Sequence, residues 1–411
     1  MRRIGLSLGA DLCWPKCFED ILGDWDPTLR VNGADVRFEV ERVMIEPFDL
    51  RAGKRYDVVL DRLTHWYKST REWIKKAVLM DGLYVLNNPW SVQSMEKHTS
   101  YCAMMRLGFP IPDTWLVPPK EYDEAPDLET TLTRYARFFD LDEIGRRVGY
   151  PSFMKPFDGG GWVGVSKVDD AESLKSSYDE SGKFVMHLQR GVLPFDKFVR
   201  CVGIGADVRV VEYDPSAPLH GRYTKAHDHL PEADLERLRK ITLTINAFFG
   251  WDFNSCECLL KDGVWHPIDF ANPCPDSQVT SLHRHFPWLV LGNLRWALFN
   301  AATKRSKPAT LDWEPYFEIA DGPGTLDEKL DEYAALSDER MATRAFEEFC
   351  EEHLGPLDEV ALEYFTTDRA KDAVRAKVTA LFPEHEVEEF TEHFWSEIGA
   401  WRDEFQSGAA R

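Results

Sequence analysis

Residues 152–168 of the chain read SFMKPFDGGGWVGVSKV. Two alternating stretches, typical of β-strands, flank a tip of Asp158 followed by Gly159, Gly160 and Gly161. Glycines allow backbone N–H groups to approach an anion closely, and Lys155 on the first strand would add a positive charge. The stretch is not a Walker A loop, because Lys155 precedes the glycines. By itself it fits a phosphate-gripping hairpin and a flexible turn with a surface lysine equally well.

A second informative stretch is residues 254–276, NSCECLLKDGVWHPIDFANPCPD. The Asp-Gly pair at 262–263 predicts a tight turn between two strands, so Glu257 and Asp269 can face each other across the hairpin. Cysteines and apolar residues alternate with the acids, which favours one shared face over opposite faces of the sheet. Two neighbouring carboxylates, with Asn272 close by, suit Mg²⁺.

The remaining elements predict a mixed chain with α/β and α+β parts. Strand-like and helix-like segments alternate over residues 1–90, which predicts a small parallel α/β domain. In it, residues 69–82 form a helix with Trp73, Ala77 and Met80 on one face. Helices are expected over 91–112, 120–148 and 231–249. Residues 150–215 are expected to form an antiparallel sheet.

The C-terminal part of the chain is acidic and helical. From Leu311 onward it carries 27 Asp and Glu against 9 Lys and Arg, which accounts for −18 of the net charge of −21. This balance argues against nucleic-acid binding. Apolar stripes at Met341, Ala345 and Phe349 and at residues 387–401 are expected to pack on the body of the protein or on a second subunit, so a homodimer is compatible with the sequence.

Cysteine usage and hydropathy indicate the compartment. The eight cysteines have irregular spacings, so free thiols in a reducing cytoplasm are expected instead of a disulfide framework or a zinc site. No stretch approaches the roughly 20 apolar residues that a membrane-spanning helix needs. The start, MRRIGLSLGADLCWPK, is interpreted as a first β-strand and not as a signal peptide.

The order of these features resembles the ATP-grasp superfamily, in particular its glutathione synthetase and ribosomal-protein glutamate-ligase branch. The stretch NNPWSVQSMEKHTSYCAMMRLGFPIPDTWLV is similar to the family's passage into the nucleotide-binding domain, which gives Lys97 the place of the first ATP-contacting lysine. Lys155 and the loop Gly159, Gly160 and Gly161 match the second lysine and the glycine-rich flap over the phosphates.

The resemblance extends through the following 110 residues. HLQRGVLPFD is similar to the hinge, with Gln189 beside the adenine and Asp196 at the ribose hydroxyls. Arg200 in RCVGIG matches a substrate or phosphate contact, and Arg222 in HGRYTK matches a basic residue that faces the γ-phosphate. Glu257 and Asp269, 12 residues apart, match the two magnesium acids.

One feature departs from the family's pattern. The last motif of the family is commonly acid-x-Asn, whereas Asp269 and Asn272 are separated by two residues here. The role of Asn272 as a third metal ligand is therefore weaker than that of Asp269. The resemblance covers roughly residues 55–300 and does not account for the C-terminal helices.

The resemblance implies a domain plan and an activity. The plan is a pre-ATP-grasp domain over 1–90, an ATP-grasp nucleotide-binding and catalytic domain over 91–305 and a helical acidic extension over 306–411. The implied activity is that of an ADP-forming carboxylate–amine ligase that uses ATP and Mg²⁺, acts through an acyl phosphate and takes small-molecule carboxylate and amine substrates. The alternatives are a phosphotransferase, a ligase with a thiol or other acceptor, and a non-catalytic nucleotide-binding regulator.

Some polar residues near these motifs have two interpretations. His283 and His285, in SLHRHFPW, line an acceptor pocket or form a surface cluster at a helix N-terminus. Lys225, just past Arg222, belongs to a substrate loop or to an exposed polar loop.

Overall fold

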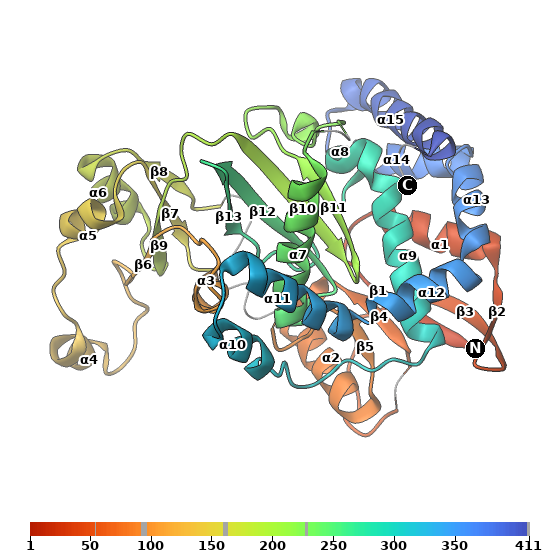
Figure 1. Ribbon diagram of the computed structural model, residues 1–411, viewed down its shortest axis with the longest axis horizontal. Coiled ribbons are helices and arrows are strands. Elements are labelled where there is room, and N and C mark those ends of the chain that lie inside the picture. The colour runs from red at the N-terminus through yellow and green to blue at the C-terminus, as the bar shows by residue number, and fades with distance from the viewer. Residues whose placement is uncertain (54, 92–96, 159–162, 227–228, 409–411) are drawn as a thin grey trace. The chain divides into compact units, whose positions relative to one another are not determined.

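The computed structural model describes residues 1–53, 55–91, 97–158, 163–226 and 229–408 (Figure 1). These residues divide into two compact units. Unit 1 comprises Met1–Gln93, Val199–Cys256 and Pro273–Arg411, and unit 2 comprises Ser94–Phe198 and Glu257–Asn272. Neither unit is therefore one continuous stretch of sequence.

A five-stranded sheet with strand order β2-β3-β1-β4-β5 forms the first part of unit 1. Its strands are β1 (Arg2–Ser7), β2 (Thr28–Val31), β3 (Ala34–Arg42), β4 (Val58–Asp61) and β5 (Tyr84–Leu86). β1 pairs parallel with β3 and β4, and β4 pairs parallel with β5, whereas β2 and β3 form an antiparallel hairpin. The parallel α/β arrangement predicted for residues 1–90 is confirmed.

Helix α2 (Lys68–Asp81) packs against this sheet through a face that differs from the predicted one. Ile74, Ala77 and Val78 are buried together with side chains of β4 and β5. The helix ends at Gly82, whose φ of 64° is the left-handed conformation that glycine adopts at little cost. The predicted helix is confirmed, but of the three residues with the predicted spacing Ala77 is buried whereas Met80 is 66% exposed.

Helix α9 closes the other side of the same sheet. Its sequence, FPWLVLGNLRWALFNAA, is apolar on nearly all sides, and accordingly almost every residue of Phe286–Ala302 is buried. It contacts β1, β4 and helix α1 (Trp14–Trp25) (Figure 1). Residues almost 300 positions apart therefore share one core.

Residues 199–256 and 273–285 form the middle part of unit 1 and contain strands and helices. β10 and β11 pair antiparallel, and the first part of β12 lies next to β10. The elements are β10 (Lys197–Ile204), β11 (Asp207–Glu212), η3 (Leu219–Gly221), α7 (Glu232–Phe249), β12 (Phe253–Lys261), α8 (Val279–Leu282) and η4 (His283–His285), whereas η1 (Leu63–His65) lies between β4 and α2. The helix predicted at 231–249 is confirmed.

The C-terminal helices belong to unit 1 and pack on its body. They are α10 (Glu314–Asp321), α11 (Leu326–Met341), α12 (Thr343–His353), α13 (Gly355–Tyr364), α14 (Asp368–Thr379), η5 (Glu384–Glu386) and α15 (Val387–Ser407). α13 and α14 contact α1, where Lys377 forms a buried ion pair of 3.5 Å with Asp11. Phe394, Ile398 and Trp401 of α15 are buried, as expected for packing on the body of the protein.

The other predicted stripe of the C-terminal region is wrong. α11 ends at Met341, and Ala342 adopts a left-handed conformation with φ of 54°, so Met341 does not share a helix with Phe349. Ala345 is exposed, whereas Phe346 and Phe349 are the buried aromatic residues of α12. No glycine or proline marks this helix break, so the sequence did not predict it.

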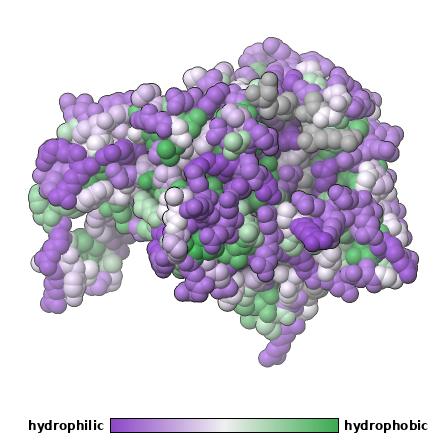
Figure 2. Space-filling model, viewed as in Figure 1, coloured by the Kyte–Doolittle hydropathy of each residue, from purple (hydrophilic) through white to green (hydrophobic). Residues whose placement is uncertain are grey.

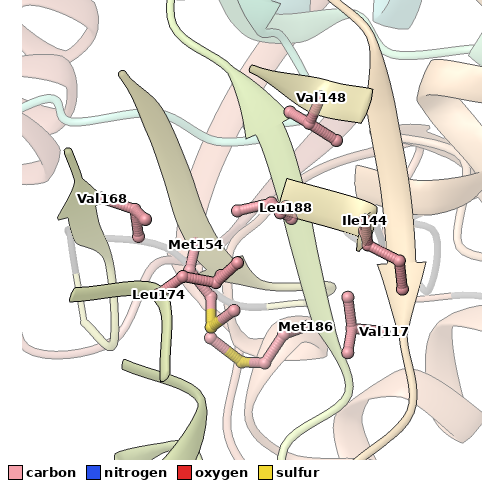
Figure 3. Close-up of a cluster of buried hydrophobic side chains, with 8 residues drawn as sticks. All are labelled: Val117, Ile144, Val148, Met154, Val168, Leu174, Met186 and Leu188. Atoms are coloured by element: carbon pink, nitrogen blue, oxygen red, sulfur yellow. The ribbon is translucent and has the colours of Figure 1, made fainter. Parts of the chain in front are cut away.

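Unit 2 is built on a four-stranded sheet with the order β6-β9-β7-β8, in which all pairs are antiparallel. Its elements are α3 (Lys97–Arg106), β6 (Thr114–Val117), α4 (Leu128–Tyr135), α5 (Leu141–Val148), β7 (Ser152–Pro156), β8 (Ser166–Val168), α6 (Ala171–Glu180) and β9 (Met186–Arg190). One face of the sheet packs on α5 and α6. Figure 3 shows this core, formed by Val117, Ile144, Val148, Met154, Val168, Leu174, Met186 and Leu188.

Residues 150–215 differ from the predicted single antiparallel sheet in two ways. The predicted strands are present and antiparallel, but β7, β8 and β9 belong to the sheet of unit 2, whereas β10 pairs with β11 in unit 1. Helix α6 also interrupts them, and it begins with a capping box between Asp170 and Ser173. A polar helix with Leu174 as its one fully buried side chain lacks the apolar periodicity that identifies a helix from sequence.

The predicted hairpin near residue 262 is confirmed. β12 pairs antiparallel with β13 (Val264–Asp269), and Asp262 and Gly263 form the turn with φ of 51° and 75°. β12 starts in unit 1 and, from Glu257 onward, belongs to unit 2 together with β13.

The surface seen in Figure 2 is mostly hydrophilic, with hydrophobic residues scattered over it. Across the described residues, no helix combines the length and the apolar character that a membrane span requires.

Candidate functional site

Lys155 lies on the face of the unit 2 sheet opposite to the hydrophobic core. Met154 and Leu188 point into that core, so by strand alternation Lys155, His187 and Gln189 lie on the other face. Lys155 is paired with His187 in the β7–β9 register, and its Nζ donates a hydrogen bond of 2.8 Å to Oε1 of Gln189. The first strand of the glycine-rich hairpin therefore presents its lysine to a polar face.

The surroundings of Lys155 reduce its basicity. The side chain is 8% exposed, its Nζ lies 5.1 Å from the centre of the Tyr101 ring, and it also donates to the carbonyl of Ile268 at 3.3 Å. Burial lowers the pKa of Lys155 to about 8, although Asp269 and Glu257 oppose this shift. Lys155 therefore loses its proton at a lower pH than an exposed lysine does.

Lys97 is the first residue of α3 and lies beside the predicted metal ligands. Its side chain is 5% exposed, and Nζ contacts both oxygens of Asp269, at 3.1 and 2.9 Å. Its backbone N–H donates to the carbonyl of Phe157, next to the glycine loop, at 2.6 Å. Lys97 is thus fixed within unit 2 at both its backbone and its charged end.

Glu257 and Asp269 are register partners on the β12–β13 hairpin. Their neighbours Cys256, Cys258 and Phe270 are buried, so the two acids share the less buried face, as predicted. The amide nitrogen of Asn272 lies 3.3 Å from Oδ1 of Asp269. Two carboxylates and an amide are hard oxygen donors, and this donor set fits Mg²⁺ better than a softer metal.

The structure gives less detail about two other predicted nucleotide contacts, which are Asp196 and the glycine loop. Asp196 is exposed in the connection between β9 and β10, where its N–H donates to the carbonyl of Leu260 at 2.8 Å. Gly159, Gly160 and Gly161 lie outside the described residues. The strands on either side of them, β7 and β8, pair as a hairpin with Met154 opposite Ser166.

Three residues at this face were not identified from the sequence: His98, Tyr101 and His187. His187 Nε2 lies 3.3 Å from Nδ1 of His98, and Tyr101 donates a hydrogen bond of 2.7 Å to the carbonyl of Ile268. Burial, together with the nearby Lys155, lowers the pKa of His187 to about 3, so this ring is neutral. Tyr101 stands four residues after Lys97 on a helix, and this spacing predicts a shared face.

Arg200 and Arg222 belong to unit 1, and each is held by polar contacts there. Arg200 Nε donates to Ser255 Oγ at 3.1 Å, and its Nη1 donates to the hydroxyl of Tyr223. Arg222 Nε donates to the carbonyl of Ala217 at 3.1 Å, and its Nη1 lies 3.4 Å from the Tyr213 hydroxyl. Tyr213 and Tyr223 pack edge to face, so the two arginines are parts of one polar cluster in unit 1.

His283 and His285 do not form a surface cluster, because they are only 1% and 4% exposed. His283 has a φ of 37°, a rare backbone conformation for a side chain with a Cβ. Burial lowers the pKa of His283 to about 4. His285 Nε2 lies 2.8 Å from the carbonyl of Thr224, so the loop before α9 contacts the segment that follows Arg222.

Known proteins resemble this chain in sequence and in fold. No model of a known protein family matches it. A D-alanine–D-alanine ligase of Streptomyces griseus subsp. griseus is 25% identical over 182 residues, which cover 42% of this chain and 44% of that protein. The chain therefore matches less than half the length of this curated relative.

Solved structures give the second comparison. A D-alanine–D-alanine ligase from Bacillus anthracis complexed with ATP matches with a TM-score of 0.50 and 15% identity, over 74% of this chain and 98% of that one. A RimK domain ATP-grasp protein from Sphaerobacter thermophilus matches with a TM-score of 0.45 and 14% identity, over 71% and 97% of the two chains. The chain has the ATP-grasp fold that its motifs predict, with an N-terminal parallel α/β sheet and a helical C-terminal region.

Proposed function

We propose that the protein is an ATP-dependent, ADP-forming carboxylate–amine ligase that acts through an acyl phosphate. The observation that carries the proposal is the arrangement of charges in unit 2. Lys97 contacts Asp269, and Asp269 is paired with Glu257. Both acids are close enough to Lys155 for their negative charges to raise its pKa. Two lysines close to two acids match what a site for a nucleoside triphosphate and Mg²⁺ needs.

In this proposal the residues of unit 2 bind ATP. Lys97 and Lys155 bind phosphate oxygens, Gln189 and Asp196 lie at the adenine and the ribose, and the glycine loop 159–161 covers the phosphates. Glu257 and Asp269 would hold Mg²⁺, with Asn272 as a candidate third ligand. Bound Mg²⁺ neutralises charge on the transferred phosphoryl group, which is the main requirement of phosphoryl transfer.

Arg200 and Arg222 have roles that follow from the resemblance. Arg200 would steady the substrate carboxylate or the acyl phosphate, and Arg222 would face the γ-phosphate. An amine then displaces phosphate from the acyl phosphate, so an amide, ADP and phosphate are formed and no protein nucleophile is needed. Exclusion of water by the glycine loop would protect the acyl phosphate from hydrolysis.

The substrates proposed are a small-molecule carboxylate and a small-molecule amine, and the protein is proposed to act in the cytoplasm. The D-alanine–D-alanine ligases that the chain resembles support an amino acid as one of the substrates. A phosphotransferase, a ligase with a thiol or other acceptor, and a regulator that binds nucleotide without turnover are the alternatives.

Release of ADP and phosphate, measured with pools of amino acids and other carboxylates, tests the proposal. We expect ADP formation that depends on both a carboxylate and an amine, with an amide product detected by mass spectrometry. A phosphorylated or thioester product would establish one of the other acceptors. ATP binding without turnover for any pool would favour the regulator.

A further inference from the structure

Glu397 brings a negative charge from the C-terminal helix α15 into the interior of unit 1. Its side chain is only 8% exposed, although α15 carries many solvated acids. Oε1 forms an ion pair with Lys225 Nζ, and Oε2 lies 3.1 Å from Nη2 and 3.2 Å from Nε of Arg284. One carboxylate thus joins two cations from distant parts of the sequence.

Both partners of Glu397 adjoin the segment Arg222–Lys225. Lys225 is its last residue, and Arg284 stands between two histidines, of which His285 contacts the Thr224 carbonyl at 2.8 Å. Arg284 is also held by Glu404, at 2.7 Å from its Nη1. Helix α15 therefore fixes this segment directly through Lys225 and indirectly through Arg284.

The opposite side of the segment is held by β11 and the residues after it. Thr224 N–H donates to the carbonyl of Glu212 at 2.9 Å, and the Arg222 carbonyl accepts from Asp214 N–H at 2.8 Å. Between these bonds the Tyr223 hydroxyl accepts from Arg200. The segment that carries Arg222 therefore lies between β11 on one side and the contacts of Glu397 and His285 on the other.

The charges of this cluster balance only while Glu397 is ionised. Burial by itself raises the pKa of Glu397, but the hydrogen bond and charge of Lys225 and the charge of Arg284 hold it below the usual range. Two cations then face two anions, Glu397 and Glu404. Loss of the Glu397 charge would leave the partly buried Arg284 with less compensation and would release the more exposed Lys225, so both cations would move toward solvent.

We propose that Glu397 is a positioning residue that holds the segment Arg222–Lys225, and with it Arg222, in place for phosphoryl transfer. The inference rests on the proposed ligase function and assigns a catalytic purpose to the helical extension, which the resemblance to the ATP-grasp family does not explain. Ala226, which follows the segment, and Trp401 of α15 also line one cavity of about 910 Å³.

The test compares Glu397→Gln, Glu397→Asp and Glu388→Gln. Glu388 is a matched control on the same helix, since it forms an exposed ion pair with Arg375. For Glu397→Gln we expect kcat to fall about ten-fold while KM for ATP stays within about two-fold, because Lys97, Lys155, Gln189 and Asp196 of unit 2 are unchanged and Arg222 is proposed to act on the γ-phosphate during its transfer. Glu397→Asp keeps the charge and should recover part of kcat, and Glu388→Gln should match the wild type.

A Glu397→Gln enzyme with unchanged kcat and an unchanged melting temperature would overturn the inference. The inference would also be overturned if a smaller fraction of folded protein explained the whole loss of kcat in Glu397→Gln and if Glu397→Asp recovered none of it. If Glu397→Gln does not fold, Lys225→Gln removes the direct ion pair from the other side and should also lower kcat, by less than ten-fold because the Arg284 contact with Glu397 remains.

Hydrogen exchange separates this inference from the ligase proposal. The Thr224 amide bonded to Glu212 should exchange about ten-fold faster in Glu397→Gln than in Glu388→Gln, whether or not the wild type forms ADP. Unchanged exchange would show that Glu397 does not hold the segment. An inactive wild type with this exchange difference would refute only the ligase proposal.

Discussion

At the scale of single residues, the ion pair between Lys97 and Asp269 is the most informative contact of the candidate site. Lys97 is almost fully buried, and Asp269 supplies the carboxylate that it contacts at 2.9 Å. Asp269 therefore has two roles in the proposed enzyme: it would bind Mg²⁺, and it compensates a buried charge. Glu257 is paired with Asp269 across the hairpin and serves as the comparison.

This difference predicts distinct effects of two substitutions. Asp269→Asn and Glu257→Gln should each lower kcat about 100-fold or more, because each removes a proposed metal ligand. Asp269→Asn should also lower the free energy of unfolding by about 3 kcal/mol, because it leaves Lys97 buried without its anion. Denaturant unfolding and steady-state kinetics measure the two effects. Intact turnover in both variants would show that the metal assignment is wrong.

Lys155 predicts a pH dependence of nucleotide binding. Burial lowers its pKa in the folded protein from 10.5 to about 8, so folding disfavours its protonated form. The resulting penalty on stability is full below pH 8 and is relieved between pH 8 and 10.5. In the folded protein the charge that would bind phosphate is lost as the pH rises through about 8.

We therefore expect the affinity for ATP to fall as the pH rises above about 8. Isothermal titration calorimetry from pH 6.5 to 9.5 measures this loss, the range bracketing roughly 1.5 units on either side of that pKa. Lys155→Arg is the control, since a guanidinium keeps its charge over this range and should flatten the profile. Identical profiles for the two proteins would contradict a role of Lys155 at the phosphates.

At the scale of elements, the β12–β13 hairpin depends on its turn. Gly263 has a φ of 75°, and a Cβ at this position would meet no atom within 4 Å. Any cost of a substitution there is therefore a cost of backbone conformation and not of crowding. Gly23 in α1 has the same open surroundings but an ordinary helical conformation.

The two glycines predict opposite results for the same substitution. Gly263→Ala should destabilise the protein by about 1 kcal/mol, because alanine is strained at positive φ. Gly23→Ala should stabilise it by about 0.5–1 kcal/mol, because alanine loses less conformational freedom in a helix. Thermal unfolding of both variants measures the difference. Shifts of the same sign would contradict the turn conformation.

The hairpin also shows what the sequence alone could predict. The Asp-Gly turn is a local pattern, and the hairpin and the facing of Glu257 and Asp269 were predicted correctly from it. The exact register was not determined by the turn, because an unbroken ladder would place Ile268 opposite Glu257, and an irregularity between Glu257 and Cys258 brings Asp269 there instead. α6 was missed because its polar sequence has little apolar periodicity, and the break at Ala342 occurs without a glycine or proline. The burial of His283 was missed for a different reason, since α15 and its Glu397 lie more than 100 residues away in the sequence.

At the scale of the whole molecule, the C-terminal helices are part of the core of unit 1. Lys377 of α14 pairs with Asp11 just before α1, and Tyr364 of α13 donates to Asp20 of α1 at 3.2 Å. Lys377 and Tyr364 both lie in the helical extension that the sequence predicted over 306–411. These contacts join the extension to the N-terminal part of unit 1.

Removal of the extension should therefore abolish folding of unit 1 and not only activity. We expect a chain that ends at residue 325 to lose its cooperative thermal transition and to be cleaved rapidly by protease within residues 1–90. A chain that ends at Ser407 is the control, since it keeps all helices through α15. A soluble truncated protein with the melting temperature of the full chain would contradict this expectation.

The contact of α9 with β1, β4 and α1 also has a consequence for synthesis on the ribosome. The strands of residues 1–90 leave the exit tunnel long before the α9 residues, Phe286–Ala302, that cover their apolar face. At roughly 5–20 residues per second, the nascent chain carries this uncovered surface for on the order of ten seconds or more. During that interval the N-terminal sheet exposes an apolar face of the kind that chaperones bind, and slowing of translation before residue 286 would lengthen its exposure.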